Sequence, residues 1–330
     1  MAALLLACAA AGGCPHPPDA HAPDPPTPAA VDASLRAAQT YLDGNEGPKA
    51  KAILARLLDR TPNDARAHEL MARVLTGEAV ALDAVDADAA HRARRDAYAH
   101  YDRAATLDPH PAGLHQNAAI LASMLREHGD AARHYEAAAR LDPTNPQPPL
   151  YAAQTYLQLG DTAAARDAIA RVLVIDPDEP LAHATLAMVA LGEERFDAAL
   201  EHVREARGLA PADVRFRTQE AKILRRRGEP HAALQLLVGL PPAARAERGV
   251  CLEIAAAHAA AGNHALAAAA WINRCERLGP GPEAALAAVE ASRCWLTHGD
   301  RANAVRWQRR ARLLAPELPE VAALEERLGE

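Results

Sequence analysis

Aromatic residues are scarce in this chain of 330 residues: Phe, Trp and Tyr make up only 3% of it, although half of its residues are hydrophobic. A β-sandwich or a globular enzyme core needs bulky β-branched and aromatic side chains to fill its interior. About a quarter of the residues are alanine instead, which has the highest helix propensity and lets helices approach closely. The composition therefore excludes an all-β fold and predicts an all-α protein.

An excess of positive charge is also absent. The chain has 36 Lys and Arg residues against 43 Asp and Glu residues, which gives a formal net charge of −7. A nucleic-acid-binding protein needs a clustered positive field. We therefore expect no nucleic-acid partner.

Catalytic motifs are missing as well. The sequence contains no G-x-x-x-x-G-K, G-x-S-x-G, H-E-x-x-H or C-x-x-C. The pair His68-Glu69 begins like a zinc motif but lacks the second histidine one turn later. We expect no catalytic residue, no metal, no cofactor and no small-molecule substrate, and therefore a protein that is not an enzyme.

No apolar run is long enough to span a bilayer. The uncharged apolar run at residues 2–13 has about 12 residues where about 20 are needed, but it has the length of the hydrophobic region of a secretory signal peptide. No Lys or Arg precedes Arg36, so the usual positive segment is absent. Two interpretations stay open: a signal peptide whose true start lies upstream, or an alanine-rich tail.

Small residues at positions 11–13 directly precede Cys14. This order resembles the lipobox of bacterial lipoproteins. The resemblance implies that residues 1–13 are a lipoprotein signal peptide and that Cys14 carries a lipid that anchors the protein in a membrane. A second match ends at Cys8, but it leaves too short a hydrophobic region.

A proline-rich segment follows, and we expect residues 14–30 to form an extended tether. Residues 15–30 contain seven prolines, which favour an extended, polyproline-like chain without a core. His16 and His21 lie in this segment, and we expect neither to bind a metal. Such a spacer is typical of lipoproteins, between the lipid and the folded domain.

From about residue 31 the sequence repeats. Pro109, Pro143, Pro177 and Pro211 follow one another at intervals of 34 residues. Within a period, a helical run ends at a glycine, which supplies a left-handed turn, and a second run ends before the proline. Each period therefore predicts a helix-turn-helix. The expected turn glycines are Gly129, Gly160, Gly228, Gly262 and Gly299.

The spacing of small, aromatic and proline residues within a period is similar to that of the tetratricopeptide repeat (TPR). In the fourth repeat the similarity is carried by Ala152, Ala153, Tyr156, Gly160, Ala165, Ile169 and Pro177. It implies a right-handed superhelical solenoid of about eight helix-turn-helix units over residues 31–316, with a capping helix at 317–330. The expected repeats are 31–64, 65–111, 112–145, 146–179, 180–213, 214–247, 248–281 and 282–316.

The second repeat is about 13 residues longer than the period, with an insertion near residues 77–94. The extra residues either lengthen the two helices or form a protruding contact element. Both interpretations predict helix over much of the segment. Outside the repeats no stretch is long enough for a catalytic domain, although a regulatory subunit or a hydrolase within the array stays a third alternative.

Three cysteines lie beyond Cys14: Cys251, Cys275 and Cys294. In an exported protein, Cys275 and Cys294 on consecutive helices could form a disulfide. The alternative is that all three are small, core-filling thiols.

The resemblance also implies where a ligand binds, because first helices of such repeats line a concave groove that holds a peptide. Basic residues there would favour an acidic or C-terminal carboxylate ligand, unless they form only a solvated arginine face. The constellation by which chaperone-binding members hold a terminal carboxylate is not reproduced. The groove candidates are Leu150, Tyr151, Gln154, Gln158, Ala184, Thr185, Met188, Arg215, Lys222, Arg225, Arg226 and Arg293.

Together these features predict a non-enzymatic scaffold that binds a protein or peptide. The lipoprotein resemblance implies that it is anchored to the bacterial cell envelope, faces the periplasm and assists the assembly of an envelope complex. The alternative is an untethered cytoplasmic adaptor or regulatory subunit.

Overall fold

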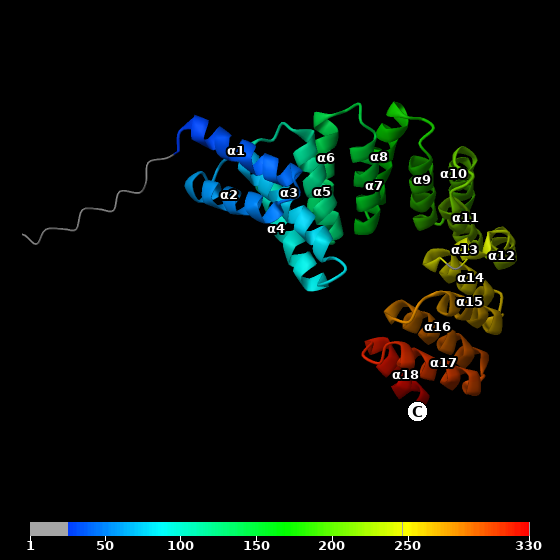
Figure 1. The fold of residues 1–330 in the computed structure, drawn as a ribbon. Helices are drawn as coiled ribbons and strands as arrows, with labels where there is room; N and C mark the ends of the chain where they lie inside the picture. The colour runs from blue at the N-terminus through cyan, green and yellow to red at the C-terminus, as the bar shows by residue number, and fades with distance from the viewer. Residues whose placement is uncertain (1–25, 246, 330) are drawn as a thin grey trace, which may run out of the picture. The chain divides into compact units, whose positions relative to one another are not determined.

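The computed structural model describes residues 26–245 and 247–329. Every regular element in these residues is an α-helix, so the predicted all-α fold is confirmed, and the helices follow one another as eight pairs (Figure 1). The pairs are α1 (Pro28–Asp43) and α2 (Gly47–Arg60), α3 (Ala65–Leu82) and α4 (Ala87–Leu107), α5 (Ala112–Met124) and α6 (His128–Leu141), α7 (Gln147–Leu159) and α8 (Thr162–Ile175), α9 (Pro180–Gly192) and α10 (Phe196–Leu209), α11 (Val214–Arg226) and α12 (Pro230–Val238), α14 (Arg248–Ala260) and α15 (His264–Arg277), and α16 (Pro282–His298) and α17 (Arg301–Leu314). The short α13 (Pro242–Arg245) follows α12, and α18 (Pro319–Gly329) follows the last pair.

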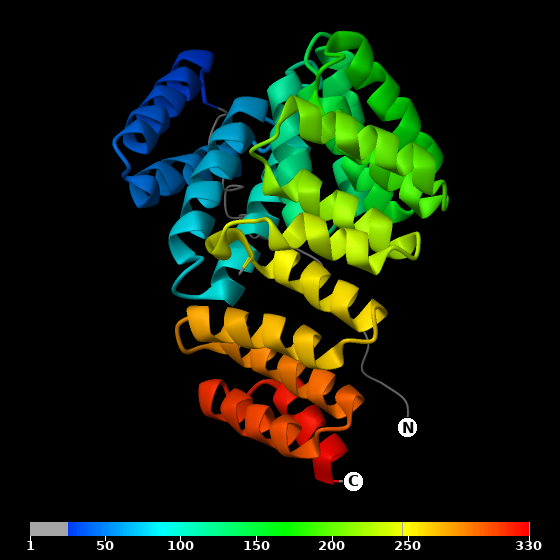
Figure 2. The same cartoon turned by 90° about the vertical axis from the view of Figure 1, so that its right-hand side faces the viewer.

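The chain divides into two compact blocks, the first ending at Leu121 and the second beginning at Ala122. In the first block, α1 to α4 pack in chain order around a core that includes Leu54 and Tyr101. In the second block, helices from α6 to α18 pack against their neighbours along the chain, and Figure 2 shows those from α14 onward as successive layers, coloured yellow to red. Each block is therefore a stack of helix pairs, as expected for a solenoid.

Alanines let these helices pack closely. Ala165 on α8, Ala199 on α10 and Ala304 on α17 have no exposed surface at all. A larger side chain at such a contact would push the two helices apart, typically at a cost of about 1–3 kcal/mol. The alanine-rich composition therefore sets the distance between helices as well as their propensity to form.

A residue in the left-handed conformation turns the chain between the two helices of most pairs. Gly160, Gly228, Gly262 and Gly299 take this role, with φ between 78° and 92°. The expectation for Gly129 is wrong. Because α5 ends at Met124, the turn falls on Arg126 (φ 61°), and Gly129 lies inside α6. Non-glycine residues also take the left-handed conformation at Asn45 and Glu194.

The second repeat accommodates its additional residues by lengthening both helices. α3 has 18 residues and α4 has 21, and Asp86 begins α4 by accepting a hydrogen bond from the Ala89 backbone N–H at 2.8 Å. Ala79 and Ala90, in the added turns, are buried. The structure therefore places the insertion in a longer helix hairpin.

Two histidines join α3 to α4 in this repeat. His68 Nε2 lies 3.0 Å from the carbonyl oxygen of Pro62, which can only accept, so this nitrogen carries the proton. Nδ1 of His68 lies 2.8 Å from Nδ1 of His100, so one of these two nitrogens donates to the other. Burial and the neighbouring His68 lower the pKa of His100, against a smaller opposite effect of Asp96.

The sixth repeat is irregular in the opposite sense. Its second helix, α12, has only nine residues, whereas α8, α10, α15 and α17 each have 14. Pro241 and Pro242 follow it closely, and a proline cannot continue a helix because it lacks the backbone N–H. The chain instead forms the single turn of α13 before the next repeat begins.

The last helix covers the end of the array. α18 packs against α16 and α17, and Val321, Leu324 and Leu328 on one of its faces are buried in their core. The predicted capping helix is therefore present. Among residues 26–245 and 247–329, no helix combines the length and the apolar character that crossing a membrane requires.

Candidate protein-binding site

The first helices of the second block, α7, α9, α11, α14 and α16, present equivalent residues at intervals of 34. We call the exposed surface that they form the first-helix face. α9 contacts both α7 and α11, and α11 contacts α14. A ligand on this face would therefore meet the same repeat positions on successive helices. One such series is Gln154, Met188 and Lys222, which are all partly exposed.

A hollow of about 520 Å³ lies on this face between α7, α9 and α11. We call it the Gln219 hollow. Five of the groove candidates line it, and they mix amide, hydroxyl and apolar side chains, with Leu157 and Leu181 beside them. These candidates are Gln154, Gln158, Ala184, Thr185 and Met188.

Gln219 gives this hollow an unpaired acceptor. Its side-chain Oε1 atom is buried and has no hydrogen-bond partner among the described residues. A buried polar atom without a partner destabilises a protein by about 1–3 kcal/mol. A ligand that donates a hydrogen bond here would remove that penalty.

Two of the predicted groove residues on α7 lie outside the Gln219 hollow. Leu150 has no exposed surface and belongs to the interior, which corrects its assignment to the groove. Tyr151 is half-buried, and its ring packs against the ring of Tyr135 on α6, with centroids 5.5 Å apart. Neither residue lines the Gln219 hollow.

The basic residues predicted for α11 divide into paired and unpaired groups. Arg215 Nη2 lies 2.6 Å from Asp213 Oδ2, and Arg225 Nε lies 2.5 Å from Glu253 Oε1. Lys222 and Arg226 form no ion pair within the part of the chain that the structure describes. Of the predicted basic wall, only these two therefore remain available to a ligand carboxylate.

Arg225 serves the structure of the array. The Glu253 side chain that it contacts is only 3% exposed, so the pair links α11 to α14 in a protected setting. Glu220, equally buried, accepts a hydrogen bond from Arg204 Nε on α10 at 2.8 Å and a second one from Arg207. Breaking a buried pair by removing one partner is strongly destabilising. These bonds hold α11 between its neighbours.

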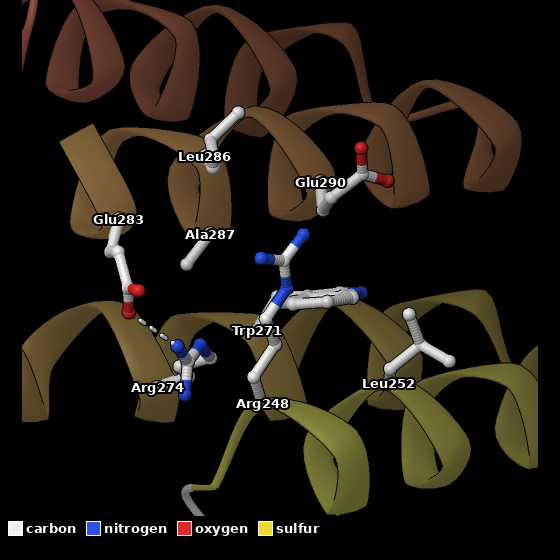
Figure 3. Close-up of a pocket in the computed structure, with 8 residues that line it drawn as sticks. All are labelled: Arg248, Leu252, Trp271, Arg274, Glu283, Leu286, Ala287 and Glu290. Carbon is white, nitrogen blue, oxygen red and sulfur yellow. Dashed lines mark hydrogen bonds and ion pairs between the residues drawn. The ribbon is translucent and has the colours of Figure 1, made fainter. Parts of the chain in front are cut away.

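A second hollow of about 280 Å³ lies between α14, α15 and α16. Figure 3 shows the indole of Trp271 between Leu252 on α14 and Glu290 on α16, with the Arg248 side chain extending from the start of α14 in the direction of α16. Arg274 at its edge pairs with Glu283 at 2.8 Å. We call it the Trp271 hollow.

Charge in the Trp271 hollow is largely neutralised within the chain. Arg293, a groove candidate on α16, places Nη1 2.6 Å from Glu290 Oε1. Trp271 was not predicted from the sequence, because it lies on a second helix and reaches this surface only by packing between two first helices. The hollow offers an apolar floor with charged edges.

The three cysteines among the described residues supply no reactive site. Cys251, Cys275 and Cys294 are free thiols, and burial raises the pKa of Cys251 and of Cys294 to about 11. These thiols therefore stay protonated and unreactive at neutral pH. No group of three or more potential metal ligands occurs within residues 26–245 and 247–329.

Comparison with known proteins identifies the repeats. A family model described as "Tetratricopeptide repeat" matches residues 26–74 and 122–189. No curated protein sequence matches the chain.

Several solved structures are similar to this chain. A tetratricopeptide repeat protein from Parabacteroides merdae is similar over 91% of this chain and 99% of its own, at 13% identity and a TM-score of 0.54. Yeast Tom70 is similar over 87% and 67%, at 16% identity and a TM-score of 0.51. A chain of the APC/C hetero-tetramer Cut9-Hcn1 is 16% identical over 91% of this chain, with a TM-score of 0.46, and this chain spans only 49% of its length. At these identities the similarity shows the fold alone.

Proposed function

We propose that this chain, which carries tetratricopeptide repeats, is a non-catalytic scaffold that binds an extended protein segment on the first-helix face of its second block. The observation that carries the proposal is the Gln219 hollow, where a buried acceptor without a partner lies among side chains of three successive first helices. No enzymatic activity is needed to account for this arrangement.

The chemistry of the hollow favours an extended segment. Gln154 and Gln158 can each donate and accept, as the backbone of an extended chain requires, and Gln219 Oε1 can accept from a backbone N–H. Met188 offers an adaptable apolar contact for a side chain of the partner. A folded partner surface would present far fewer free backbone groups.

Charge selects among such segments. Lys222 lies three residues after Gln219 on α11, and residues at that spacing share a helix face. Since Lys222 and Arg226 have no carboxylate partner among the described residues, they favour a segment with acidic residues beside its apolar anchor.

Selection from a displayed library of random peptides tests this function on the full chain. We expect the selected peptides to combine an aliphatic or aromatic residue with Asp or Glu. Fluorescence anisotropy with the labelled peptides should show at least about tenfold weaker binding for Met188→Glu and for Lys222→Glu/Arg226→Glu, because each change places like charge or a desolvated carboxylate against the ligand.

A matched control carries the same charge reversal elsewhere. Arg306 and Arg309 are exposed on the second helix α17, so Arg306→Glu/Arg309→Glu changes the net charge equally without touching the first-helix face. Equal loss of binding in this control, or no enrichment of any peptide family, would overturn the proposal.

We also propose that the scaffold is tethered to the bacterial envelope through a lipid on Cys14, faces the periplasm and assists envelope assembly. The support is the lipobox-like sequence and the proline-rich segment after it. Residues 1–25, which include Cys14, lie outside the described residues, and the expected tether over 14–30 is too long at its end, because α1 begins at Pro28. Metabolic labelling with a palmitate analogue should label the wild-type protein and not Cys14→Ser. A protein that is unlabelled and recovered from the cytoplasm would support the untethered adaptor.

A further inference from the structure

The short second helix of the sixth repeat leaves a separate hollow of about 260 Å³, lined by residues of α12 to α15. α12 ends at Val238, about a turn and a half earlier than the other second helices, while α15 beside it keeps its full 14 residues. The missing turns leave part of the α14 and α15 surface uncovered. We call this space the α12 hollow, and none of its lining residues lines the Gln219 or the Trp271 hollow.

Two buried polar atoms in the α12 hollow lack hydrogen-bond partners among the residues that the structure describes. They are Nε of Arg245 on α13 and Nδ1 of His258 on α14. Each unpaired buried group costs about 1–3 kcal/mol, and the cost is higher for a charged group. Two such atoms in one small hollow point to a ligand that supplies acceptor oxygens.

The charge of the hollow is positive. Arg245 forms no ion pair within the described part of the chain, and Arg277 uses Nε to donate to Asn273 Oδ1 at 3.0 Å, so that both of its Nη atoms stay available. No Asp or Glu lines the hollow. In contrast, Arg225 and Arg274 on neighbouring helices are each paired with a glutamate.

The remaining walls are aliphatic. Val238 and Leu266 are 56% and 52% exposed, and Ile254 between them is buried. Exposed large aliphatic side chains beside unpaired guanidinium groups match a ligand that is apolar at one end and anionic at the other.

We propose that the α12 hollow binds an aliphatic carboxylate. The carboxylate accepts hydrogen bonds from Arg245 and Arg277, and the aliphatic part packs against Val238, Ile254 and Leu266. His258 is neutral because burial lowers its pKa, and its Nδ1 atom completes the polar end by pairing with the ligand or with water that accompanies it. The site is independent of the first-helix face and works whether or not that face binds a peptide.

Two sources can present this chemistry: a free aliphatic acid, or the C-terminal carboxylate of a peptide that ends in an aliphatic residue. Isothermal titration calorimetry on the full chain separates the two sources: hexanoate represents the free acid, and acetyl-Ala-Val-Leu represents the peptide C-terminus. The matched neutral probes are hexanamide and the same peptide as its C-terminal amide. We expect at least one acid to bind at least tenfold more tightly than its amide, and the acid that binds identifies the source.

Arg245→Gln removes the charge with little change in side-chain size, and we expect it to weaken binding of that acid at least tenfold. Arg248→Gln is the control, because Arg248 lies three residues away and lines the Trp271 hollow instead. Ala269→Leu, which fills the hollow without changing charge, should also abolish binding and tests the site if Arg245→Gln does not fold. Thermal unfolding of each variant shows whether it is folded.

Three outcomes would overturn the proposal: neither acid binds at millimolar concentration, the amides bind as well as the acids, or Arg245→Gln and Ala269→Leu both bind like the wild type. Peptides selected on the first-helix face should bind Arg245→Gln unchanged. If no peptide binds the first-helix face, binding of the acid to the α12 hollow can still be tested. If no acid binds the α12 hollow, the peptide-binding function is unaffected.

Discussion

The second and the sixth repeats both break the 34-residue period, and they do so with opposite consequences. The second repeat adds whole turns to both of its helices, and the added turns bury Ala79 and Ala90. The sixth repeat shortens one helix only, and the neighbouring α15 keeps a surface that nothing covers. When both helices of a hairpin are lengthened, the added turns pack against each other. When only one helix is shortened, part of the neighbouring helix stays uncovered and a hollow forms there.

The largest effect should come from the last turn of the short helix. Leu237 on α12 has no exposed surface, and Leu237→Ala should lower the free energy of unfolding of the second block by about 2–5 kcal/mol, the usual range for a buried leucine. Guanidinium denaturation followed by tryptophan fluorescence measures this change, since Trp271, Trp295 and Trp307 all lie in that block.

Val238→Ala is the control, because Val238 is the next residue and is 56% exposed. We expect a change within about 0.5 kcal/mol there. Equal effects of the two substitutions would show that the short helix is not packed against the block.

A smaller effect, on the order of 1 kcal/mol as for one polar contact, should come from the histidine pair of the second repeat, which the sixth repeat lacks. The pKa of His100 is lowered in the folded state, so the unfolded chain binds more protons as the pH falls below about 6.5. This contribution to stability is therefore complete above that pH and is lost on acidification, because burial and the neighbouring His68 disfavour the protonated ring in the folded state.

The measurement compares denaturation midpoints at pH 7.5 and pH 5.5 for the wild type and for His100→Gln. Glutamine can donate to His68 or accept from it but does not titrate. The variant should lose less stability between the two pH values. An identical pH dependence in both proteins would contradict the lowered pKa of His100.

The smallest effect should follow from returning the second repeat to the regular period. Deleting residues 79–91 and changing Arg92 to Gly removes the 13 added residues and places glycine at the left-handed turn. Since the buried alanines of the added turns lie outside the main core cluster of the first block, which includes Leu75 and Ala97, we expect a loss within about 1 kcal/mol.

Circular dichroism and the midpoint of thermal unfolding measure the deletion. A loss as large as that of Leu237→Ala would show that the longer hairpin supports the rest of the first block. The second repeat would then differ from the sixth in some other way than by packing its added turns against each other.

Much of the fold followed from the sequence because it depends on local chemistry. The prolines 34 residues apart and the glycine at 160 predict where helices end, and the structure has the predicted turn at Gly160. Gly129 was assigned wrongly, since a glycine is equally acceptable inside a helix and only the length of α5 decides where its turn falls.

The site was predictable only where the repeat itself brings residues together. Gln154 and Met188 occupy equivalent positions of adjacent first helices, so the period alone makes them neighbours. Arg225 shows the limit: its charge predicts a ligand contact, but the buried Glu253 on the next first helix takes it up. An ion pair of this kind depends on which side chains are buried, and the spacing of residues along the sequence does not predict that.

Alanine content, turn residues and a fixed period of 34 residues were enough to predict an all-α array of helix pairs, because each of them acts within one or two helices. Which side chains are available to a ligand depends on how the helices pack. Among the described residues, packing left Gln219 Oε1, Lys222 and Arg245 without partners and neutralised Arg215 and Arg225. Those outcomes depend on distances between helices and on the solvent removed by packing, and both arise only when the repeats stack.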